Sequence, residues 1–207
     1  MEVVFLIIAL VMSVVIHEVA HGYVANMLGD PTARLQGRLT LNPVSHLDLF
    51  GSILLPALLV ISSSPFLFGW AKPVPYNPYN FTRGGRWGEA LVAGAGPAVN
   101  IVIALVFALV ARLLIGIDPA VASLAFSIVL INVMLAIFNM IPIPPLDGSK
   151  VLAAILPTSL ALQYAQFRRA LEGNPFLGFG VVILFIIIFG DYFAGAVISF
   201  ARLLAGF

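Results

Sequence analysis

Residues 3–28 read VVFLIIALVMSVVIHEVAHGYVANML, an apolar run that holds three ionisable side chains within five positions. The hydrocarbon core of a membrane takes about 20 residues of α-helix, so this run predicts a transmembrane helix. Ionisable groups are costly at that depth and usually have a function. Any chemistry is therefore expected at His17, Glu18 and His21.

The composition of the whole chain supports a membrane protein. Its 207 residues are 61% hydrophobic and only 9% charged, and the mean hydropathy is +1.10. This length suits one compact bundle, a single domain over residues 1–207 with its core in 1–150. The net charge of +1 gives no case for nucleic-acid binding. Without cysteine, any metal must be held by histidine nitrogen or carboxylate oxygen.

Four more apolar segments follow, at about 51–70, 89–117, 121–141 and 176–205. We expect an all-α polytopic membrane protein with about four full transmembrane helices and a re-entrant segment at 51–70. Residues 158–172 predict an amphipathic helix at the membrane interface, with Thr158 as its cap. Asp191 divides the last segment, which favours a short span followed by an interfacial piece over one tilted span.

The connection after the first segment has a different pattern. From Arg34 to Leu41, apolar residues or glycine alternate with polar residues. A period of two is typical of a β-strand with one apolar face. We expect a short amphipathic strand or hairpin near the site, able to pair with an extended substrate.

The spacing of the two histidines predicts a metal site. Residues four apart on an α-helix lie one turn apart on the same side, so His17 and His21 can bind one ion. Glu18 between them can reach a metal-bound water. His21 lies about 10 Å along the helix axis from the end of the run, inside the hydrocarbon. The alternatives are a chance pattern or polar residues that join helices.

Catalytic zinc needs a third protein ligand. Asp147 is the best candidate, because it directly follows an apolar span in a proline-rich stretch; it could instead cap a helix that begins at Gly148. His46 and Asp48 are weaker candidates, more typical of a solvated loop. Asn100 and Asn139 are intramembrane amides that could join helices or stabilise the oxyanion of a reacting carbonyl.

Together these motifs resemble the site-2 protease family of intramembrane zinc metalloproteases. The similar stretches are His17-Glu18-Val-Ala-His21, Gly96-Pro97-Ala-Val-Asn100 and Asn139 to Leu146-Asp147-Gly148. The resemblance implies that His17, His21 and Asp147 hold one Zn²⁺ per chain and that Glu18 is the catalytic acid and base. It also places Asn100 and Asn139 beside the active site.

The same resemblance implies that the substrates are transmembrane proteins within the lipid bilayer. Nothing in the chain resembles a PDZ or CBS domain, so it looks like a compact form. The alternatives are another membrane metalloprotease, such as a prenyl-protein endopeptidase, a metal-binding transporter, or a non-catalytic scaffold. None of them accounts for both the glutamate between ligands and the stretch 139–148. The sequence gives no oligomeric state.

The ligands also constrain the topology. For His17, His21 and Asp147 to meet at one depth, the segments 3–28 and 121–141 must run in the same direction, which requires 51–70 to enter and return. This path splits the basic residues eight to two, as the positive-inside rule favours. We expect an integral protein of a prokaryotic cytoplasmic membrane, with its N-terminus outside and its site opening to the cytosol. The larger group is Arg34, Arg38, Lys72, Arg83, Arg86, Lys150, Arg168 and Arg169, and the smaller is Arg112 and Arg202.

Overall fold

The computed structural model describes residues 2–54, 57–58, 61–62 and 70–206, and in these residues it contains helices and no strand. The long helices are α1 (Glu2–Met27), α4 (Gly88–Leu114), α5 (Pro119–Asn139) and α8 (Pro175–Ala205). The shorter ones are α2 (Thr32–Leu35), α6 (Asp147–Ile155) and α7 (Thr158–Glu172), with short turns η1 (Pro43–His46), η2 (Leu49–Leu54), η3 (Pro78–Asn80) and η4 (Gly85–Trp87).

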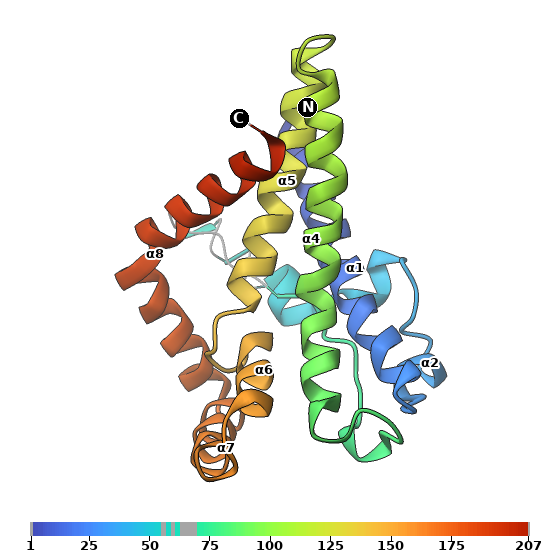
Figure 1. Ribbon diagram of the computed structural model, residues 1–207, viewed down its shortest axis with the longest axis vertical. Helices are drawn as coiled ribbons and strands as arrows, with labels where there is room; N and C mark the ends of the chain where they lie inside the picture. Colours follow the sequence, from blue (N-terminus) through green and yellow to red (C-terminus); the bar gives the residue numbers. More distant parts are fainter. Residues whose placement is uncertain (1, 55–56, 59–60, 63–69, 207) are drawn as a thin grey trace.

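Among the described residues, four helices are long and apolar enough to cross a membrane, and they coincide with α1, α4, α5 and α8. Figure 1 shows α1 and α5 running from the top of the view downward, with α4 running upward between them in the chain. The expected shared direction of the first and fourth apolar segments is therefore confirmed. Most of the expected re-entrant path at 51–70 lies outside the described residues.

The helix ends follow from local chemistry. Asp118 precedes α5, and its carboxylate accepts hydrogen bonds from the amides of Ala120 and Val121. Asn174 caps α8 in the same way. Each cap is followed by proline in the first turn, where no amide hydrogen is required. These caps set where the α4–α5 hairpin turns and where the last long helix begins.

Small residues allow the long helices to pack closely. The buried core between α4, α5 and the end of α8 consists of Ala104, Ala108, Val129, Val133, Val197, Ala201 and Ala205. In a lipid environment, association relies on such close contact because burial from water adds no drive between helices. Large apolar side chains instead lie exposed on the outer faces, as expected for lipid contact, including Ile7, Val106 and Ile187.

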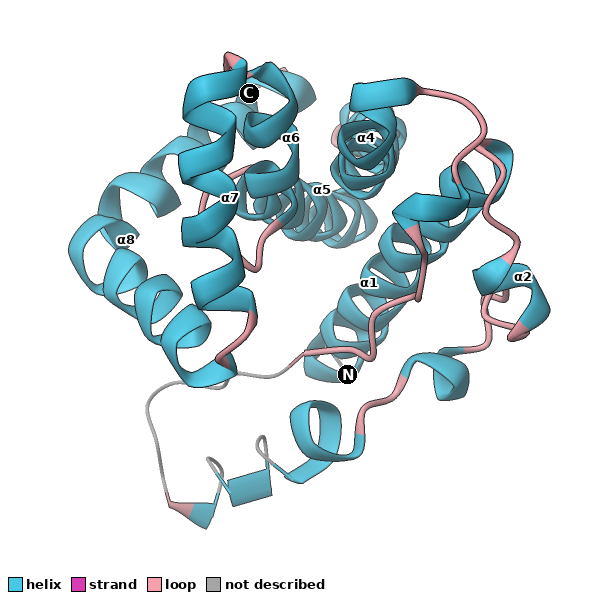
Figure 2. Ribbon diagram, turned by 90° about the horizontal axis from the view of Figure 1, so that it is seen from below, coloured by secondary structure: helices cyan, strands magenta, loops and turns pink. Residues whose placement is uncertain are grey.

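The shorter helices take positions around this bundle. Figure 2 shows α6, α7 and α8 on one side of the α4–α5 pair, and α1 and α2 on the other. The bounds of α7 confirm the helix expected at 158–172. The expected cap is wrong, because Pro157 is the capping residue and Thr158 is already the first residue of the helix.

One further expectation, the strand at 34–41, is corrected. Residues 34–41 are the end of α2 followed by irregular chain. Asp30 starts α2 by accepting hydrogen bonds from the amide and hydroxyl of Thr32, and Gly37 turns the chain with a φ of 64°. The last apolar segment forms one continuous helix that passes through the exposed Asp191. Figure 1 shows that α8 changes direction along its length.

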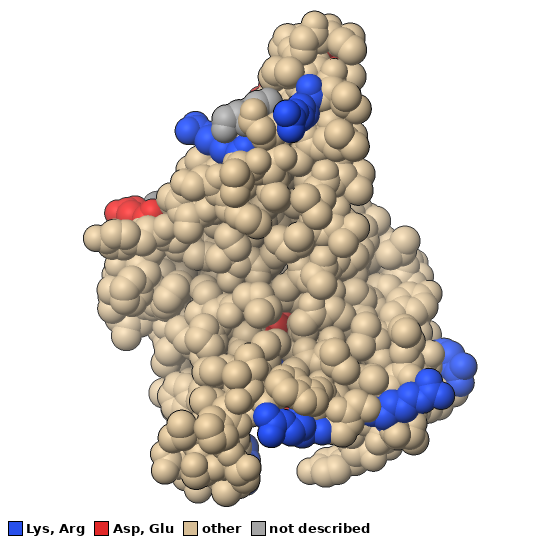
Figure 3. Space-filling model, viewed as in Figure 1, with Lys and Arg blue, Asp and Glu red and all other residues tan. Residues whose placement is uncertain are grey.

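Basic side chains lie at both ends of the molecule. Figure 3 shows some Lys and Arg side chains near the lower end of the view and others near the top. At one end, Arg86 donates to the carbonyl of Ala154, and Arg168 pairs with Glu89. At the other, Arg112 lies beside Gly206 after α8.

Candidate metal centre

Two helices bring the three candidate ligands together. His17 and His21 lie one turn apart on α1, and Asp147 is the first residue of α6. The Oδ2 atom of Asp147 is 3.1 Å from Nε2 of His17 and 3.2 Å from Nε2 of His21. All three side chains are buried. In the part of the chain that the structure describes, no other group of His, Cys, Asp or Glu converges in this way.

The Nδ1 atoms of the two histidines have hydrogen-bond partners that determine what the Nε2 atoms can bind. Nδ1 of His21 is 2.7 Å from the carbonyl oxygen of Val92, and Nδ1 of His17 is 2.5 Å from Oδ1 of Asn100. Both partners are acceptors, so both Nδ1 atoms carry hydrogen. A neutral ring then presents a lone pair at Nε2. Two nitrogen lone pairs and a carboxylate oxygen therefore face one another, and a cation between them relieves the repulsion.

The spacing and donor set fit zinc. Ligand atoms about 2 Å from a tetrahedral ion lie about 3.3 Å from one another, close to the two separations found here. The rings of His17 and His21 are nearly perpendicular, at 87°, so their lone pairs approach from different directions. Two imidazoles and one carboxylate, with a fourth position open, are the ligands of many catalytic zinc sites.

Two glycines create the space for these ligands. A Cβ atom on Gly96 of α4 would lie 2.5 Å from Nε2 of His17 and 2.6 Å from Cε1 of His21. A Cβ atom on Gly148 would lie 2.2 Å from the carbonyl oxygen of Met140 at the end of α5. The first glycine lets α4 pass close to the histidine rings. The second lets α6 begin beneath α5, with Asp147 directed at the rings.

Glu18 faces a different neighbour, the covering segment, which we define as residues 70–77. Its Oε2 accepts a hydrogen bond of 2.8 Å from the backbone amide of Val74. Arg38 holds the same segment by donating to the carbonyl oxygens of Lys72 and Pro73. This chain path lies against α1 because Gly22 has no side chain: a Cβ there would meet Val74 at 2.7 Å.

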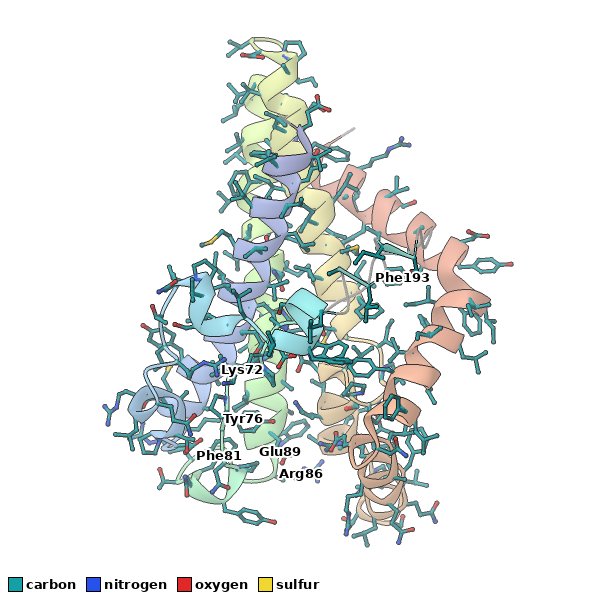
Figure 4. The ribbon with its side chains drawn as sticks, turned by 180° about the vertical axis from the view of Figure 1, so that it is seen from behind. Lys72, Tyr76, Phe81, Arg86, Glu89 and Phe193 are labelled. Atoms are coloured by element: carbon teal, nitrogen blue, oxygen red, sulfur yellow. The ribbon has the colours of Figure 1, made fainter. Side chains whose placement is uncertain are left out.

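A cavity of about 360 Å³ lies beside the end of this site, lined by residues that include Arg86, Glu89 and Lys150. Nζ of Lys150 is 3.8 Å from Oδ1 of Asp147 and lies over the ring of Tyr76. Figure 4 shows Tyr76, Phe81, Arg86 and Glu89 grouped around the lower end of α4. Lys150 therefore lies between this cavity and the carboxylate of Asp147.

The weaker ligand candidates have other partners. His46 is fully buried with Nε2 against the carbonyl of Thr40, and Asp48 accepts from the amide of Gly51, so both organise the loop after α2. Asp147 does not cap α6, because Leu146 is the capping residue and no side-chain cap is made.

The two asparagines lie in different environments. Asn100 is fully buried against His17, whereas the amide of Asn139 donates to Leu135 on its own helix. Sequence reasoning missed Ser13 and Asn132, which contact each other and Asn100. The polar Asn132 inside an apolar span was the one available signal.

The geometry defines a class of protein. A His-His-Asp cluster suited to zinc, with a glutamate between the histidines, lies among helices long enough to cross a membrane. A zinc ligand set with an adjacent general base is the arrangement of a metallopeptidase. Here that arrangement is buried within apolar helices, which makes the class an intramembrane one.

Comparison with known proteins supports the same class. The model of "Peptidase family M50" matches residues 5–122 and 117–187. YwhC of Bacillus subtilis, named as a candidate zinc metalloprotease, is 38% identical over 196 residues, 91% of this chain and 83% of YwhC. Rip2 of Mycolicibacterium smegmatis, named likewise, is 29% identical over 188 residues, 85% of this chain and 64% of Rip2.

An archaeal protein is similar as well: the zinc metalloprotease MJ0392 of Methanocaldococcus jannaschii is 28% identical over 151 residues, 73% of this chain and 34% of MJ0392. No solved structure gave a significant match. The chain belongs to peptidase family M50, the site-2 protease family. It is an intramembrane zinc metalloprotease.

Proposed function

We propose that this protease hydrolyses peptide bonds within or next to transmembrane helices of other membrane proteins. His17, His21 and Asp147 hold the zinc, and Glu18 is the general base and acid. The observation that carries the proposal is the convergence of the two Nε2 atoms and Oδ2 of Asp147 at 3.1 and 3.2 Å. This convergence lies between α1 and α6, and α1 exposes large apolar side chains.

The depth of the ligands supports a membrane substrate. His21 lies six residues before the end of α1 at Met27. At 1.5 Å per residue, this remainder is roughly 10 Å long. A peptide bond that reaches the ligands must itself be at this depth, which favours a substrate that already lies in the bilayer.

The residues divide the chemistry between them. Bound zinc supplies a Lewis acid that polarises the scissile carbonyl and lowers the pKa of the attacking water. Glu18 takes a proton from that water as the C–O bond forms, and then gives the proton to the departing amine nitrogen as the C–N bond breaks. The covering segment holds the carboxylate of Glu18 through the amide of Val74.

The two asparagines take different roles in this proposal. Asn100 orients His17, because its oxygen accepts from Nδ1 and its amide hydrogens are directed at Asn132 and Ser13. Asn139 contacts the substrate: it is half-buried in the last turn of α5, directly before the loop that leads to Asp147. Replacing Asn139 is expected to impair cleavage without releasing zinc.

We further propose that the site opens toward the cytosol of a prokaryotic cell, across its cytoplasmic membrane. The relatives are bacterial and archaeal. The eight basic residues of the larger group belong to one end of the predicted path and favour the cytosolic side. The cavity beside Arg86 and Lys150 lies at this end and would admit water.

The test compares the purified protein in detergent with the variant Glu18→Gln. The variant should keep one zinc per chain and lose at least about 100-fold of its cleavage rate on a transmembrane substrate, the usual contribution of a general base. A chelator should abolish cleavage by the parent protein. Zinc transport that survives in Glu18→Gln would indicate a transporter, and absence of bound zinc in the parent would indicate a scaffold; either result would overturn the proposal.

A further inference from the structure

A row of buried polar side chains runs from the metal site into the centre of the bundle. We call it the polar chain; it consists of His17, Asn100, Asn132 and Ser13, which come from α1, α4 and α5. Nδ1 of His17 is 2.5 Å from Oδ1 of Asn100, whose Nδ2 is 2.8 Å from Oδ1 of Asn132. Nδ2 of Asn132 is 3.0 Å from Oγ of Ser13. None of the four is more than 5% exposed.

The direction of each hydrogen bond is determined at the far end of the polar chain. Nδ2 of Asn132 lies 2.9 Å from the carbonyl oxygen of Ile128, which can only accept. The amide group of Asn132 must therefore place its nitrogen there and turn its oxygen toward Asn100. Nδ2 of Asn100 donates a hydrogen bond to that oxygen, and it also lies 3.5 Å from the carbonyl oxygen of Ser13.

The orientation of the Asn100 amide in turn determines which ring nitrogen of His17 carries hydrogen. Since the nitrogen of Asn100 is used by Asn132 and Ser13, its oxygen faces His17 and can only accept. Nδ1 of His17 must then be the protonated nitrogen, which leaves the lone pair of Nε2 directed at Asp147 and His21. A chain of neutral side chains thus selects the ring form that can bind a metal.

We infer that Asn132 and Ser13 are positioning residues for the zinc site. They orient the amide of Asn100 and, through it, the ring of His17. This inference rests on the proposed role of His17 as a ligand. His21 needs no such chain, because its Nδ1 is held directly by the backbone carbonyl of Val92.

The rival role for these residues is structural, since polar side chains commonly join helices in membranes. A purely structural role would alter unfolding but leave zinc affinity and the hydrogen bond of His17 unchanged in the folded protein. The chain has only three histidines, so their ring signals can be followed individually. His21 then serves as a reference within the same molecule.

The test uses zinc-loaded protein in detergent, labelled with ¹⁵N-histidine, as the parent and as Asn132→Leu, Ser13→Ala and Ser127→Ala. Ser127 is a matched control, because it is on α5 but lies outside the polar chain: it is half-buried, and its hydroxyl donates to the carbonyl oxygen of Ser123 on its own helix. In the parent, the Nδ1 protons of His17 and His21 should both exchange slowly with water. In Asn132→Leu, the proton of His17 should exchange faster and that of His21 should not change.

Zinc affinity, measured by competition with a chelator, is the second readout. Asn132→Leu should weaken it about 10–100-fold, the usual effect of losing a partner behind a ligand. Ser13→Ala should weaken it less, since Ile128 still holds Asn132, and Ser127→Ala should not alter it.

The outcomes separate this inference from the proposed function. If His17 does not contribute to zinc binding in the parent protein, both the proposed function and the positioning role are overturned. A parent that binds zinc through His17, beside a folded Asn132→Leu variant with equal affinity and an unchanged His17 proton, overturns the positioning role alone. If Asn132→Leu fails to fold, the parent spectrum and Ser13→Ala still decide: rapid exchange at Nδ1 of His17 in the parent rejects the inference.

Discussion

The two sides of the metal site are built differently. On the ligand side, His17 is held by the polar chain, whose asparagines are completely buried between three helices. On the other side, Glu18 is held by one backbone amide of the covering segment, which itself depends on loop contacts from Arg38 and from Asp30. In the proposed mechanism, the metal ligands are therefore held by the long helices, and the general base is held by a loop. Changes on the first side should affect metal binding, and changes on the second should affect catalysis.

Gly96→Ala is expected to have the largest effect on zinc binding and cleavage, because position 96 lies against the rings of His17 and His21. The new methyl group would lie 2.5 Å from Nε2 of His17, so the ring or α4 must move. We expect the zinc affinity to fall about 100-fold and cleavage activity to be lost as a result. Gly94→Ala is the matched control, since a Cβ there meets nothing within 4 Å. Equal zinc content in the two variants would contradict the tight approach of α4 to the ligands.

Val74→Pro probes the opposite side. Proline has no amide hydrogen, so Glu18 loses its donor while the metal ligands stay untouched. A hydrogen bond to a charged group contributes about 1.5–3 kcal/mol, so the cleavage rate should fall about 10–100-fold at unchanged zinc affinity. Val74→Ala keeps the amide and serves as the control. A loss of zinc in Val74→Pro alone would show that the two sides are not separable.

Asp30→Asn should have the smallest effect, on stability. Oδ1 and Oδ2 of Asp30 accept from Thr32, from the amide of Asn77 and from the side chain of Asn80, which ties the chain after α1 to the end of the covering segment and to the loop that follows it. Burial alone would raise the pKa of Asp30, but the hydrogen bonds from Asn80, Thr32 and Asn77 outweigh it and the pKa is lowered. At neutral pH the variant should lose about 2 kcal/mol of unfolding free energy.

The pH dependence follows from the sign of that shift. A carboxylate with a lowered pKa in the folded state stabilises the protein above its unfolded pKa, near the usual 3.8, and this stabilisation is lost as the pH falls toward the folded value. The difference between the parent and Asp30→Asn should therefore be constant from pH 7 to about pH 5 and shrink below pH 4 or so. Asp118→Asn is the control, because asparagine caps a helix as well as aspartate. A difference that grows on acidification would refute this account of Asp30.

Much of the ligand side was predictable from sequence, and little of the loop side was. The spacing of His17 and His21 suffices to put both rings on one face of a helix, and the position of Asp147 after an apolar span made it the best third ligand. Helix α7 was predicted with its correct ends, because its apolar and charged faces alternate with helical periodicity.

The errors have local causes. The alternation at 34–41 is also compatible with one turn of helix and a bend, and the hydrogen bonds of Asp30 to Thr32 select that alternative. A strand also needs a partner to complete its hydrogen bonds, which no single segment can reveal. The contact of Asn132 with Ser13 joins residues 119 apart in the chain, so it depends on how the helices pack.

The bond between His17 and Asp147 links positions separated by 130 residues. An ion placed there would act as a cross-link that closes nearly two thirds of the polypeptide into one loop, much as a disulfide does in a secreted protein that has cysteines. Binding of the metal would then hold α1 and α6 together as well as enable hydrolysis.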